Sequence, residues 1–261
     1  MTSLDGRTVF ITGASTGVGK AIAYEIAKVG KANLILAARR IALIEELKTE
    51  LESKYEGVKV LPLKLDVSKV EEIESTIASL PEEFANIDVL INNAGLALGV
   101  DYVRNLDMQD TMKVINTNVI GLIAMTKAII RIFYKNDGHG DIVNISSIAG
   151  QDSYPGGSIY CCSKAAVSMF TSTLRQETID TRIRVMEIDP GMIDTDFLTV
   201  RAHGDKAAAD RVSRGLEPLT GQDIGELIVF GITRRENFVL SQATALPSFQ
   251  ADCTYMYRKE N

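Results

Sequence analysis

The stretch Thr8-Val-Phe-Ile-Thr-Gly-Ala-Ser-Thr-Gly-Val-Gly19 joins an apolar run to a turn that is rich in glycine. The run predicts a buried strand, and the pattern after the turn predicts a helix that continues to about Val29. A glycine turn between a strand and a helix lets backbone N–H groups approach a pyrophosphate at the helix N-terminus. The spacing is G-x-x-x-G-x-G rather than G-x-G-x-x-G, so the assignment depends on the position of the turn after the first strand. The candidate dinucleotide-binding residues of this turn are Gly13, Ser15, Thr16, Gly17 and Gly19.

The alternation of apolar runs and helical patterns continues along the chain. Further buried strands are predicted at 33–38, 58–65, 88–92, 141–146 and 183–189. Long helices are predicted from Asp107, as N-cap, to about 134 and over 158–180, and Ser68-Lys-Val-Glu71 matches a capping box. Apolar strands separated by helices predict an α/β fold with a parallel, doubly wound sheet covered by helices on both faces.

The last third of the chain departs from this pattern. Residues 194–217 are mixed in character and contain Gly204 and Gly215, which predicts a mobile substrate flap. The pattern returns with a helix at 221–231 and a short strand at 238–241. Because no Pro-, Gly- or Ser-rich linker interrupts the series, residues 1–261 are predicted to form a single domain.

Composition narrows the classes of partner. The net charge of −6 and the isoelectric point near 5.1 argue against nucleic acid and anionic membranes as partners. The start is not expected to be a signal segment, and the sequence predicts no apolar run that approaches the roughly 18 residues a membrane span needs. Three cysteines without a CxxC pair and only two histidines predict neither a disulfide framework nor a metal site. We therefore expect a cytoplasmic protein with a small-molecule substrate.

Tyr160 and Lys164 are the most informative residues for chemistry. They stand at i and i+4 on a predicted helix, so their side chains share one face. A lysine cation beside a phenol favours the phenolate, and the pair is therefore expected to lower the tyrosine pKa toward neutrality. Such a tyrosine can donate or accept a proton. Ser147 follows the strand at 141–146, where its hydroxyl can hold a carbonyl oxygen in front of the tyrosine.

The second strand ends in Arg39-Arg40, where a site for NAD would place a carboxylate. A guanidinium matches the charge of a ribose 2′-phosphate, so the sequence predicts NADP(H), with Arg39 as the better candidate and Arg40 beside it.

Further candidates follow the other strands. The amide of Asn93 and the small Gly95 can lie against a cofactor, and Asp66 either reaches an adenine amine or caps a helix. Asn118 is a polar residue on an apolar helix face, so it is either a satisfied core residue or part of the site. The backbone after the sixth strand can bind a carboxamide, and Thr195 can bind a phosphate. The residues of this last segment are Pro190, Gly191, Ile193 and Thr195.

The motifs TGASTGVG, NNAG, TNVIG, YCCSK and PG-x-x-x-T, together with Ser147, resemble those of the short-chain dehydrogenase/reductase family in order and spacing. The resemblance implies that Ser147 orients a substrate carbonyl and that Tyr160 is the acid and base. It also implies that Lys164 binds the nicotinamide ribose and lowers the tyrosine pKa, and that Asn118 holds a water of a proton relay. It further implies a homotetramer that is paired largely through the two long helices.

A narrower resemblance concerns the substrate. NNAG-Leu-Ala-Leu-Gly99, Gly156-Gly-Ser-Ile-Tyr160 and the segment Phe197–Asp205 resemble the NADP-dependent 3-hydroxy acid dehydrogenases, fungal members above all, which are similar to serine dehydrogenases. Ala202 departs from the aromatic residue that is usual in that group. The predicted reaction is hydride transfer between NADP(H) and a small 3-hydroxy acid or 3-oxo acid. A hydroxy acid needs a cation for its carboxylate, and the candidate is Arg201 in the flap, with a solvated surface arginine as the alternative.

Two alternatives stay open at this point. A broad carbonyl reductase or 3-oxoacyl reductase would share the fold, and an acidic carrier protein would then require a basic patch, for which Arg131 and Lys135 are candidates. A non-catalytic sensor that binds NADPH is the second alternative. Such a protein is expected to have lost Ser147, Tyr160 or Lys164, and all three are present.

Overall fold

The seven strands of the computed structural model, which describes residues 2–259, form one sheet in the order β3-β2-β1-β4-β5-β6-β7. Every neighbouring pair of strands is parallel, so all the carboxyl ends of the strands lie at one edge of the sheet. The strands are β1 (Thr8–Thr12), β2 (Asn33–Ala38), β3 (Lys59–Lys64), β4 (Val89–Asn92), β5 (His139–Ile145), β6 (Arg182–Pro190) and β7 (Gln242–Ala245).

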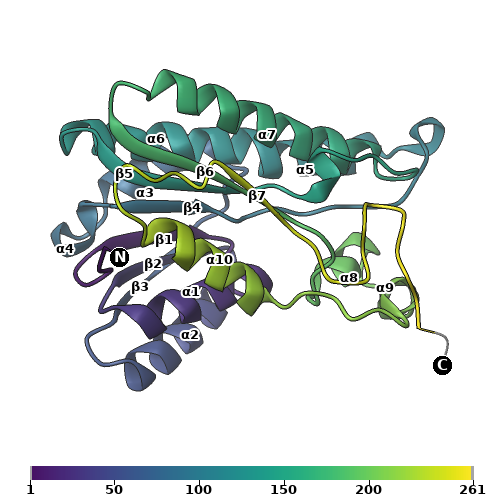
Figure 1. Cartoon of the computed structure of the whole chain (residues 1–261), viewed down its shortest axis with the longest axis horizontal. Coiled ribbons are helices and arrows are strands. Elements are labelled where there is room, and N and C mark those ends of the chain that lie inside the picture. Colours follow the sequence, from purple (N-terminus) through teal and green to yellow (C-terminus); the bar gives the residue numbers. More distant parts are fainter. Residues whose placement is uncertain (1, 260–261) are drawn as a thin grey trace.

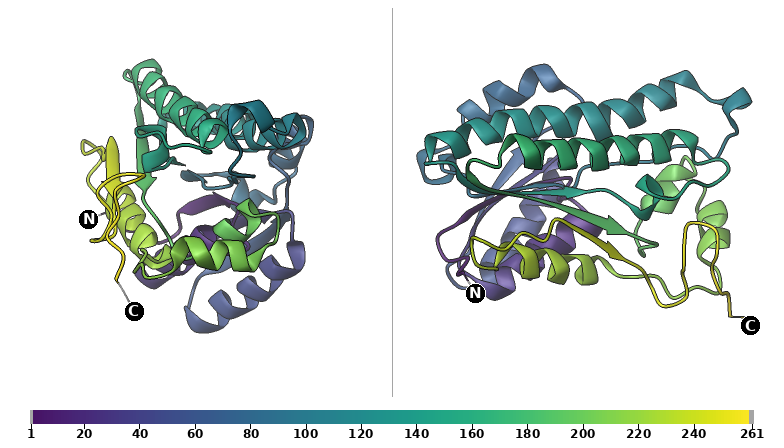
Figure 2. Two further views of the ribbon diagram at one scale, coloured as in Figure 1. Left: turned by 90° about the vertical axis from the view of Figure 1, so that its right-hand side faces the viewer. Right: turned by 45° about the horizontal axis from the view of Figure 1, so that its top comes forward.

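Helices cover both faces of this sheet, as Figure 1 and the two further views of Figure 2 show. On one face lie α1 (Gly17–Val29), α2 (Ile41–Lys54) and α10 (Gly221–Ile232). The other face carries α3 (Val70–Ala78), α4 (Glu82–Ala85), α5 (Met108–Ile115), α6 (Leu122–Lys135) and α7 (Ser158–Glu177). Two short helices, α8 (Phe197–Arg201) and α9 (Lys206–Ser213), lie with the C-terminal segment beyond one end of the sheet. The predicted doubly wound parallel fold is confirmed.

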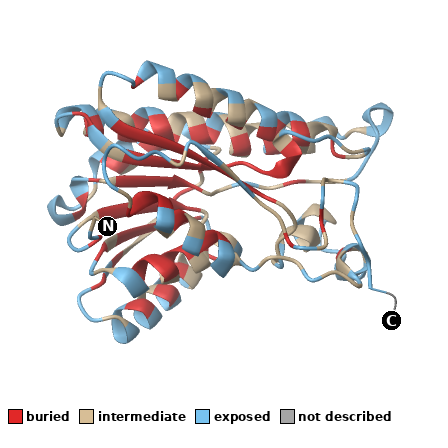
Figure 3. Cartoon of the chain, viewed as in Figure 1, coloured by how far each residue is buried: buried red, intermediate tan, exposed pale blue. Residues whose placement is uncertain are grey.

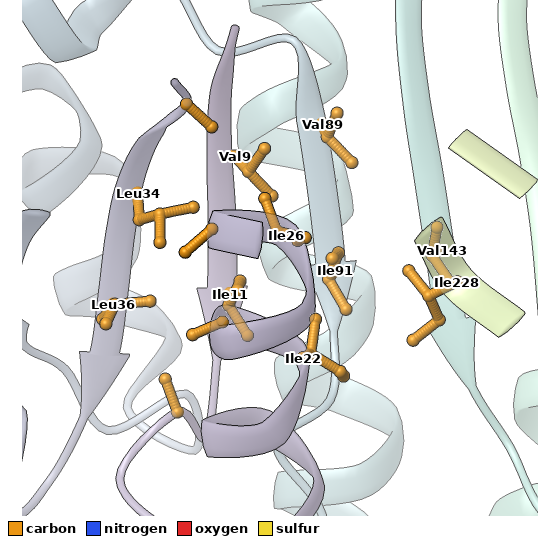
Figure 4. Close-up of a cluster of buried hydrophobic side chains, with 14 of the residues drawn as sticks. Val9, Ile11, Ile22, Ile26, Leu34, Leu36, Val89, Ile91, Val143 and Ile228 are labelled. Atoms are coloured by element: carbon orange, nitrogen blue, oxygen red, sulfur yellow. The ribbon is translucent and has the colours of Figure 1, made fainter. Parts of the chain in front are cut away.

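The core consists of two apolar layers, one on each side of the sheet (Figure 3). In the first layer Ile22 and Ile26 of α1 pack against Val9 and Ile11 of β1 (Figure 4). The central strands are buried along their whole length, because helices cover both of their faces. This explains why continuous apolar runs, rather than alternating ones, mark these strands in the sequence.

Three sequence expectations need correction. Ser68 does not cap α3, which begins at Val70, because its hydroxyl donates a hydrogen bond back to Asp66 (2.7 Å). The last strand is Gln242–Ala245 and not 238–241, because an edge strand paired on one side needs no apolar run. The stretch Met108–Lys135 is helical throughout and is long and apolar enough to cross a membrane by length and composition alone. Its inner side, however, packs on the sheet as a core helix does.

A buried ion network ties the amino-terminal end of the sheet to the last helix. Arg184 on β6 donates to both carboxylate oxygens of Asp141 on β5, at 2.6 and 2.7 Å. Arg7 donates to the same carboxylate at 2.9 Å. Arg184 also donates to carbonyl oxygens at the end of α10, including that of Ile232 at 2.9 Å. Charges that are this well paired can be tolerated in the interior, whereas a single remaining charge cannot.

Replacement of Asp141 by alanine should therefore lower the free energy of unfolding by about 3–5 kcal/mol, because two arginines lose their counter-ion. Urea denaturation followed by circular dichroism measures this change. The control is Glu83→Ala, which removes an exposed partner of Lys59 and should cost at most about 1 kcal/mol. An equal, small loss in both variants would contradict the structural role of the network.

Candidate active site

A cavity of about 950 Å³ lies at the carboxyl ends of the strands, between the sheet, the flap and the C-terminal segment. This volume suits a dinucleotide together with a small substrate. Nearly all the residues predicted from the sequence line its wall, from the glycine turn to Arg201. Gly19 and Asn118 are the exceptions, and both support the wall from behind.

The glycine turn depends on close backbone packing. Gly13 and Gly17 have positive φ angles of 66° and 55°, which favour glycine. A Cβ atom on Gly19 would lie 2.4 Å from the carbonyl oxygen of Gly13 and 2.6 Å from Nδ2 of Asn93. The turn therefore leaves room for a ligand only on the cavity side, at the N-terminus of α1, where backbone N–H groups favour a phosphate.

Asn93 holds this turn in place. Its amide nitrogen Nδ2 donates to the carbonyl oxygens of Thr12 (2.9 Å) and Gly13 (3.2 Å). The hydroxyl of Thr12 in turn accepts from the backbone nitrogens of Asn93 and Ala94. Asn93 was predicted to contact a cofactor directly. Its side chain instead holds the glycine turn that would bind the cofactor. Gly95 does face the site, because a Cβ atom there would lie 3.6 Å from Nζ of Lys164.

Both predicted arginines border the cavity at the end of β2. Arg40 donates from one nitrogen to the hydroxyls of Ser15 (3.1 Å) and Thr16 (2.8 Å). Arg39 is exposed and lines the same wall. The arrangement gives this end of the cavity two cations beside two hydroxyls, which suits a ribose phosphate. Arg40 is the better anchored of the two, whereas the sequence favoured Arg39.

Asp66, which follows β3, makes a local turn. Its Oδ1 accepts from the backbone nitrogen (3.1 Å) and the hydroxyl of Ser68. It lines the cavity, so its second oxygen remains a candidate acceptor for an adenine amine.

Tyr160 and Lys164 lie together on α7, with Nζ of the lysine 5.8 Å from the centre of the phenol ring. Lys164 is buried, and its Nζ donates to the carbonyl oxygen of Ile145 at 2.7 Å. The ring of Phe197, on the flap, lies 5.5 Å from the ring of Tyr160. Helix α8 therefore packs against the tyrosine.

The protonation of this pair differs from the sequence expectation. Burial raises the pKa of Tyr160 above its usual value, and a hydrogen-bonding contribution from Ser147 offsets only part of this rise. Burial also lowers the pKa of Lys164 to about 8, against the attraction of Asp189 and Glu187. Desolvation therefore dominates the pKa of Tyr160, and the lowering expected from the neighbouring lysine is wrong.

Two buried carboxylates, those of Glu187 and Asp189, lie on the face of β6 that α7 covers. Glu187 accepts a hydrogen bond from the hydroxyl of Ser168, whose oxygen also lies 3.2 Å from the carbonyl oxygen of Lys164. Asp189 accepts from the side-chain amides of Gln151 (2.6 Å) and Gln242 (2.8 Å). Burial and the neighbouring Glu187 raise the pKa of Asp189 to about 7. This pair is the nearby negative charge that favours protonated Lys164.

Ser147 lies in the turn that follows β5 and is buried at the cavity wall. Its hydroxyl donates to the carbonyl oxygen of Pro190 (3.3 Å) and accepts from the backbone nitrogen of Ala149 (3.1 Å). The first of these bonds is long, so a substrate oxygen can replace it at small cost.

Asn118 lies in a π-helical segment, Asn116–Gly121, between α5 and α6. Its Oδ1 accepts from the backbone nitrogen of Leu96, and its Nδ2 donates to the Leu96 oxygen and to Ser163. Both amide hydrogens are taken, so Asn118 is a satisfied core residue that fixes the loop beside Gly95. Water binding through an oxygen of this residue stays a prediction. A π segment often marks a functional position in a helix.

The end of β6 and the loop after it form another part of the wall, where Pro190, Gly191, Ile193 and Thr195 line the cavity. Gly191 donates its backbone N–H to Ala245 at 2.8 Å. The methyl group of Thr195 borders the glycine turn, since it would lie 3.3 Å from a Cβ atom on Gly17. This brings the predicted phosphate-binding threonine beside the N-terminus of α1.

Arg201 is held more firmly than a free surface residue. It donates to the carbonyl oxygens of Gly99 (3.1 Å) and Gly156 (3.2 Å) and to the hydroxyl of Tyr154 (2.8 Å). These bonds use three of its five N–H donors and fasten α8 to two loops of the cavity wall. Two donors remain, so Arg201 can fasten the flap and still bind an anion.

The C-terminal segment also contributes to the cavity, which was not predicted from the sequence. Gln250, Cys253, Thr254, Met256 and Arg258 all line the cavity. No periodic pattern marks these residues, because they belong to a turn and extended chain rather than to a helix or strand. Tyr154, the partner of Arg201, was missed for the same reason.

Comparison with known proteins agrees with this geometry. Residues 7–206 match the family model described as short chain dehydrogenase. The chain is 58% identical over 260 residues to the NADP-dependent 3-hydroxy acid dehydrogenase of Schizosaccharomyces pombe, with full coverage of both chains. It is 38% identical over 243 residues to a sulfoacetaldehyde reductase of Chromohalobacter salexigens, covering 93% of this chain and 94% of that protein. The closed form of a serine dehydrogenase complexed with NADP⁺ superposes with a TM-score of 0.88 at 33% identity, covering 97% and 100% of the two chains.

The fold and the site define an oxidoreductase with a dinucleotide cavity at the carboxyl edge of a parallel sheet. The chain belongs to the short-chain dehydrogenase family, which confirms the resemblance seen in its motifs.

Replacing each arginine at the end of β2 in turn identifies the one that binds the 2′-phosphate. Loss of that arginine should weaken NADPH binding by about 1.5–3 kcal/mol, the range for hydrogen bonds to charged groups, and leave NADH binding little changed. Titration of Arg39→Ala and Arg40→Ala by nicotinamide fluorescence measures both affinities, and the chain has no tryptophan to interfere. Equal losses for NADPH and NADH in both variants would contradict phosphate recognition by these side chains.

The carboxylates of β6 should set the pH range of the enzyme. Without their negative charge the pKa of Lys164 falls, so its ammonium is lost at lower pH. In the double variant Glu187→Gln/Asp189→Asn the high-pH fall of kcat/KM for NADPH should therefore move down by roughly one pH unit.

The pH profile of the exposed variant Glu83→Gln should match that of the wild type, because its partner Lys59 lies at the surface. An unchanged or raised midpoint in the double variant would show that the two carboxylates do not act on Lys164.

Proposed function

We propose that the protein transfers a hydride between NADP(H) and a small 3-hydroxy acid or its 3-oxo acid. The observation that carries this proposal is the placement of Ser147, Tyr160 and Lys164 in one cavity with the arginine pair at its far end. The predicted cofactor and substrate agree with the names of the yeast dehydrogenase and the NADP⁺-bound serine dehydrogenase to which the chain is similar.

The residues of the cavity fit such a cofactor, since the glycine turn would receive its pyrophosphate and the arginines its 2′-phosphate. When bound, the nicotinamide supplies or accepts the hydride. Ser147 holds the substrate oxygen, and Tyr160 donates its phenolic proton to that oxygen as the carbonyl is reduced. The ammonium of Lys164 stabilises the phenolate that remains. In oxidation the same phenolate takes up the hydroxyl proton.

The relatives share one feature of substrate chemistry. A 3-hydroxy acid and sulfoacetaldehyde both have a single carbon between the reacting carbon and the anionic group. We therefore assign to Arg201 the role of binding that anion. The arginine fits this role because it reaches the cavity from the flap and keeps two N–H donors after fastening α8.

The alternative of a 3-oxoacyl reductase for carrier-bound substrates is less well supported. Arg131, one of its candidate basic residues, pairs with Glu74 at 3.0 Å on the outer surface of α6. Neither Arg131 nor Lys135 lines the cavity. A broad carbonyl reductase remains the second candidate, and substrate rates separate the two.

The test of the proposed function compares initial rates for serine, 3-hydroxypropionate and a simple secondary alcohol, each with NADP⁺ and with NAD⁺. We expect turnover of the two acids with NADP⁺ and little turnover of the plain alcohol. Tyr160→Phe, the matched control, should bind NADPH normally and lose activity by about 10²–10⁴-fold. Turnover of the plain alcohol alone would favour the carbonyl reductase instead.

Arg201→Met separates anion binding from flap fastening in the same assay. If Arg201 binds the anion, kcat/KM should fall roughly 10–150-fold more for the acids than for the plain alcohol, because both substrates lose the fastening of α8 but only the acids lose a charged hydrogen bond. Equal losses for both substrates would leave Arg201 with the fastening role only.

We also propose a homotetramer that works in the cytoplasm. Large apolar side chains are exposed along α5 and α7, among them Met112 and Met169, and such a surface suits contact with a second copy. The three cysteines are free thiols, which fits a reducing compartment.

Sedimentation equilibrium should give a mass four times that of the 28.5 kDa chain. Met169→Glu should reduce that mass, because it places a charge in the proposed interface, whereas Val29→Glu at the exposed end of α1 should not. A monomeric wild type would contradict the assembly.

A further inference from the structure

The C-terminal segment, residues 246–259, follows β7 and lies against both the loop after β6 and the substrate flap. Residues 249–257 form a compact turn of their own. The backbone nitrogen of Tyr257 donates to Phe249 (2.9 Å) and that of Ala251 to Tyr255 (3.0 Å). Asp252 closes the turn by accepting from the backbone of Thr254 and Tyr255. These bonds make the turn a stiff unit.

One end of this unit holds the loop that faces the cofactor. Gln250 is buried, its Oε1 accepts from the backbone nitrogen of Met192 at 2.8 Å, and its Nε2 donates to the carbonyl oxygen of Asp252 at 3.1 Å. A Cβ atom on Gly191 would lie 2.4 Å from this Oε1, so the loop and the side chain are in direct contact. A displacement of the loop must therefore move Gln250.

The other end holds the second half of the flap. Arg258 donates to the carbonyl oxygens of Val212 (3.0 Å) and Arg214 (2.8 Å) at the end of α9. A cation at this position also complements the helix dipole. The backbone nitrogen of Lys259 donates to the carbonyl oxygen of Gly215 at 3.0 Å. The end of α9 is thus attached to the C-terminal segment.

The two halves of the flap are attached to the rest of the molecule by different routes. The first half, α8, continues directly from Thr195 and is fastened by Arg201 to the loops at Gly99 and Gly156. The second half, α9, is linked to the cofactor loop through Arg258, the turn at 249–257 and Gln250. The chain beyond α9 also pairs with this loop at Leu219, whose backbone nitrogen donates to Met192 at 3.0 Å. The route through Arg258 is the one that acts on the end of α9 itself.

We infer that Gln250 and Arg258 are positioning residues through which the loop after β6 controls the second half of the substrate flap. A ligand that orders this loop should then stabilise α9 in its closed position, and closure of α9 should strengthen binding of that ligand, because such coupling is reciprocal. The inference rests on NADP(H) as the ligand of the cavity and adds a structural link that the reaction itself does not require.

Hydrogen exchange measured by mass spectrometry on the whole protein, with and without NADP⁺, tests this link without any substrate. In the wild type NADP⁺ should slow exchange several-fold in both 197–205 and 206–215. In Arg258→Ala the effect on 197–205 should remain, and the effect on 206–215 should fall below twofold. Gln250→Leu should produce the same selective loss, because it removes the acceptor for Met192.

Arg235→Ala, which removes an exposed arginine beyond the end of α10, serves as the control and should behave as the wild type. Arg258→Lys should restore part of the effect, since a lysine can still donate to one carbonyl. If NADP⁺ slows exchange of 206–215 in Arg258→Ala as much as in the wild type, the link is refuted. It is also refuted if the variant loses the effect of NADP⁺ equally in both halves of the flap. A wild type in which NADP⁺ alters exchange nowhere along the cavity wall would refute the assignment of the cofactor together with the link.

Kinetics provide a second readout. In Arg258→Ala the KM for the acid substrate should rise several-fold while kcat changes less than twofold, because the chemistry at Tyr160 is untouched. A fall in kcat with an unchanged KM would contradict a positioning role.

Discussion

The hydrogen bond from Nζ of Lys164 to the carbonyl oxygen of Ile145 determines the character of this site. It fixes the lysine inside the protein, next to the half-buried phenol of Tyr160 at the cavity wall. Desolvation favours the neutral form of each group, which keeps the tyrosine protonated and lowers the lysine pKa to about 8. The site without ligand is therefore prepared to donate a proton, and the ammonium is available to stabilise the phenolate that results.

The parallel sheet explains why these residues meet. Parallel strands place all their carboxyl ends at one edge, and the segments that follow β1, β2, β4, β5 and β6 all contribute to the same cavity. The glycine turn, the arginine pair, Ser147 and the loop at Pro190 lie far apart in the sequence but are neighbours at this edge. The flap and the C-terminal segment then close the cavity from outside the sheet.

The sequence was sufficient for the fold and for most of the site, because both depend on local patterns. Continuous apolar runs marked the buried strands, and the residues at their ends could be placed at one edge without coordinates. Three features depend on tertiary contacts and could not be predicted. The effect of burial on Tyr160 requires knowledge of its surroundings, the bonding of Asn118 requires the position of Leu96, and the contribution of Gln250 and Arg258 requires the path of an irregular segment.

The central claim is that burial, rather than the lysine charge, governs the ionisation of Tyr160 before a ligand binds. The most direct measurement is an ultraviolet pH titration of the unliganded protein, with the signal of Tyr160 obtained as the difference between wild type and Tyr160→Phe. We predict that the phenolate of this residue forms only above the usual tyrosine pKa of about 10. A phenolate that forms well below that value would show that the charge of Lys164 outweighs desolvation and would contradict the claim.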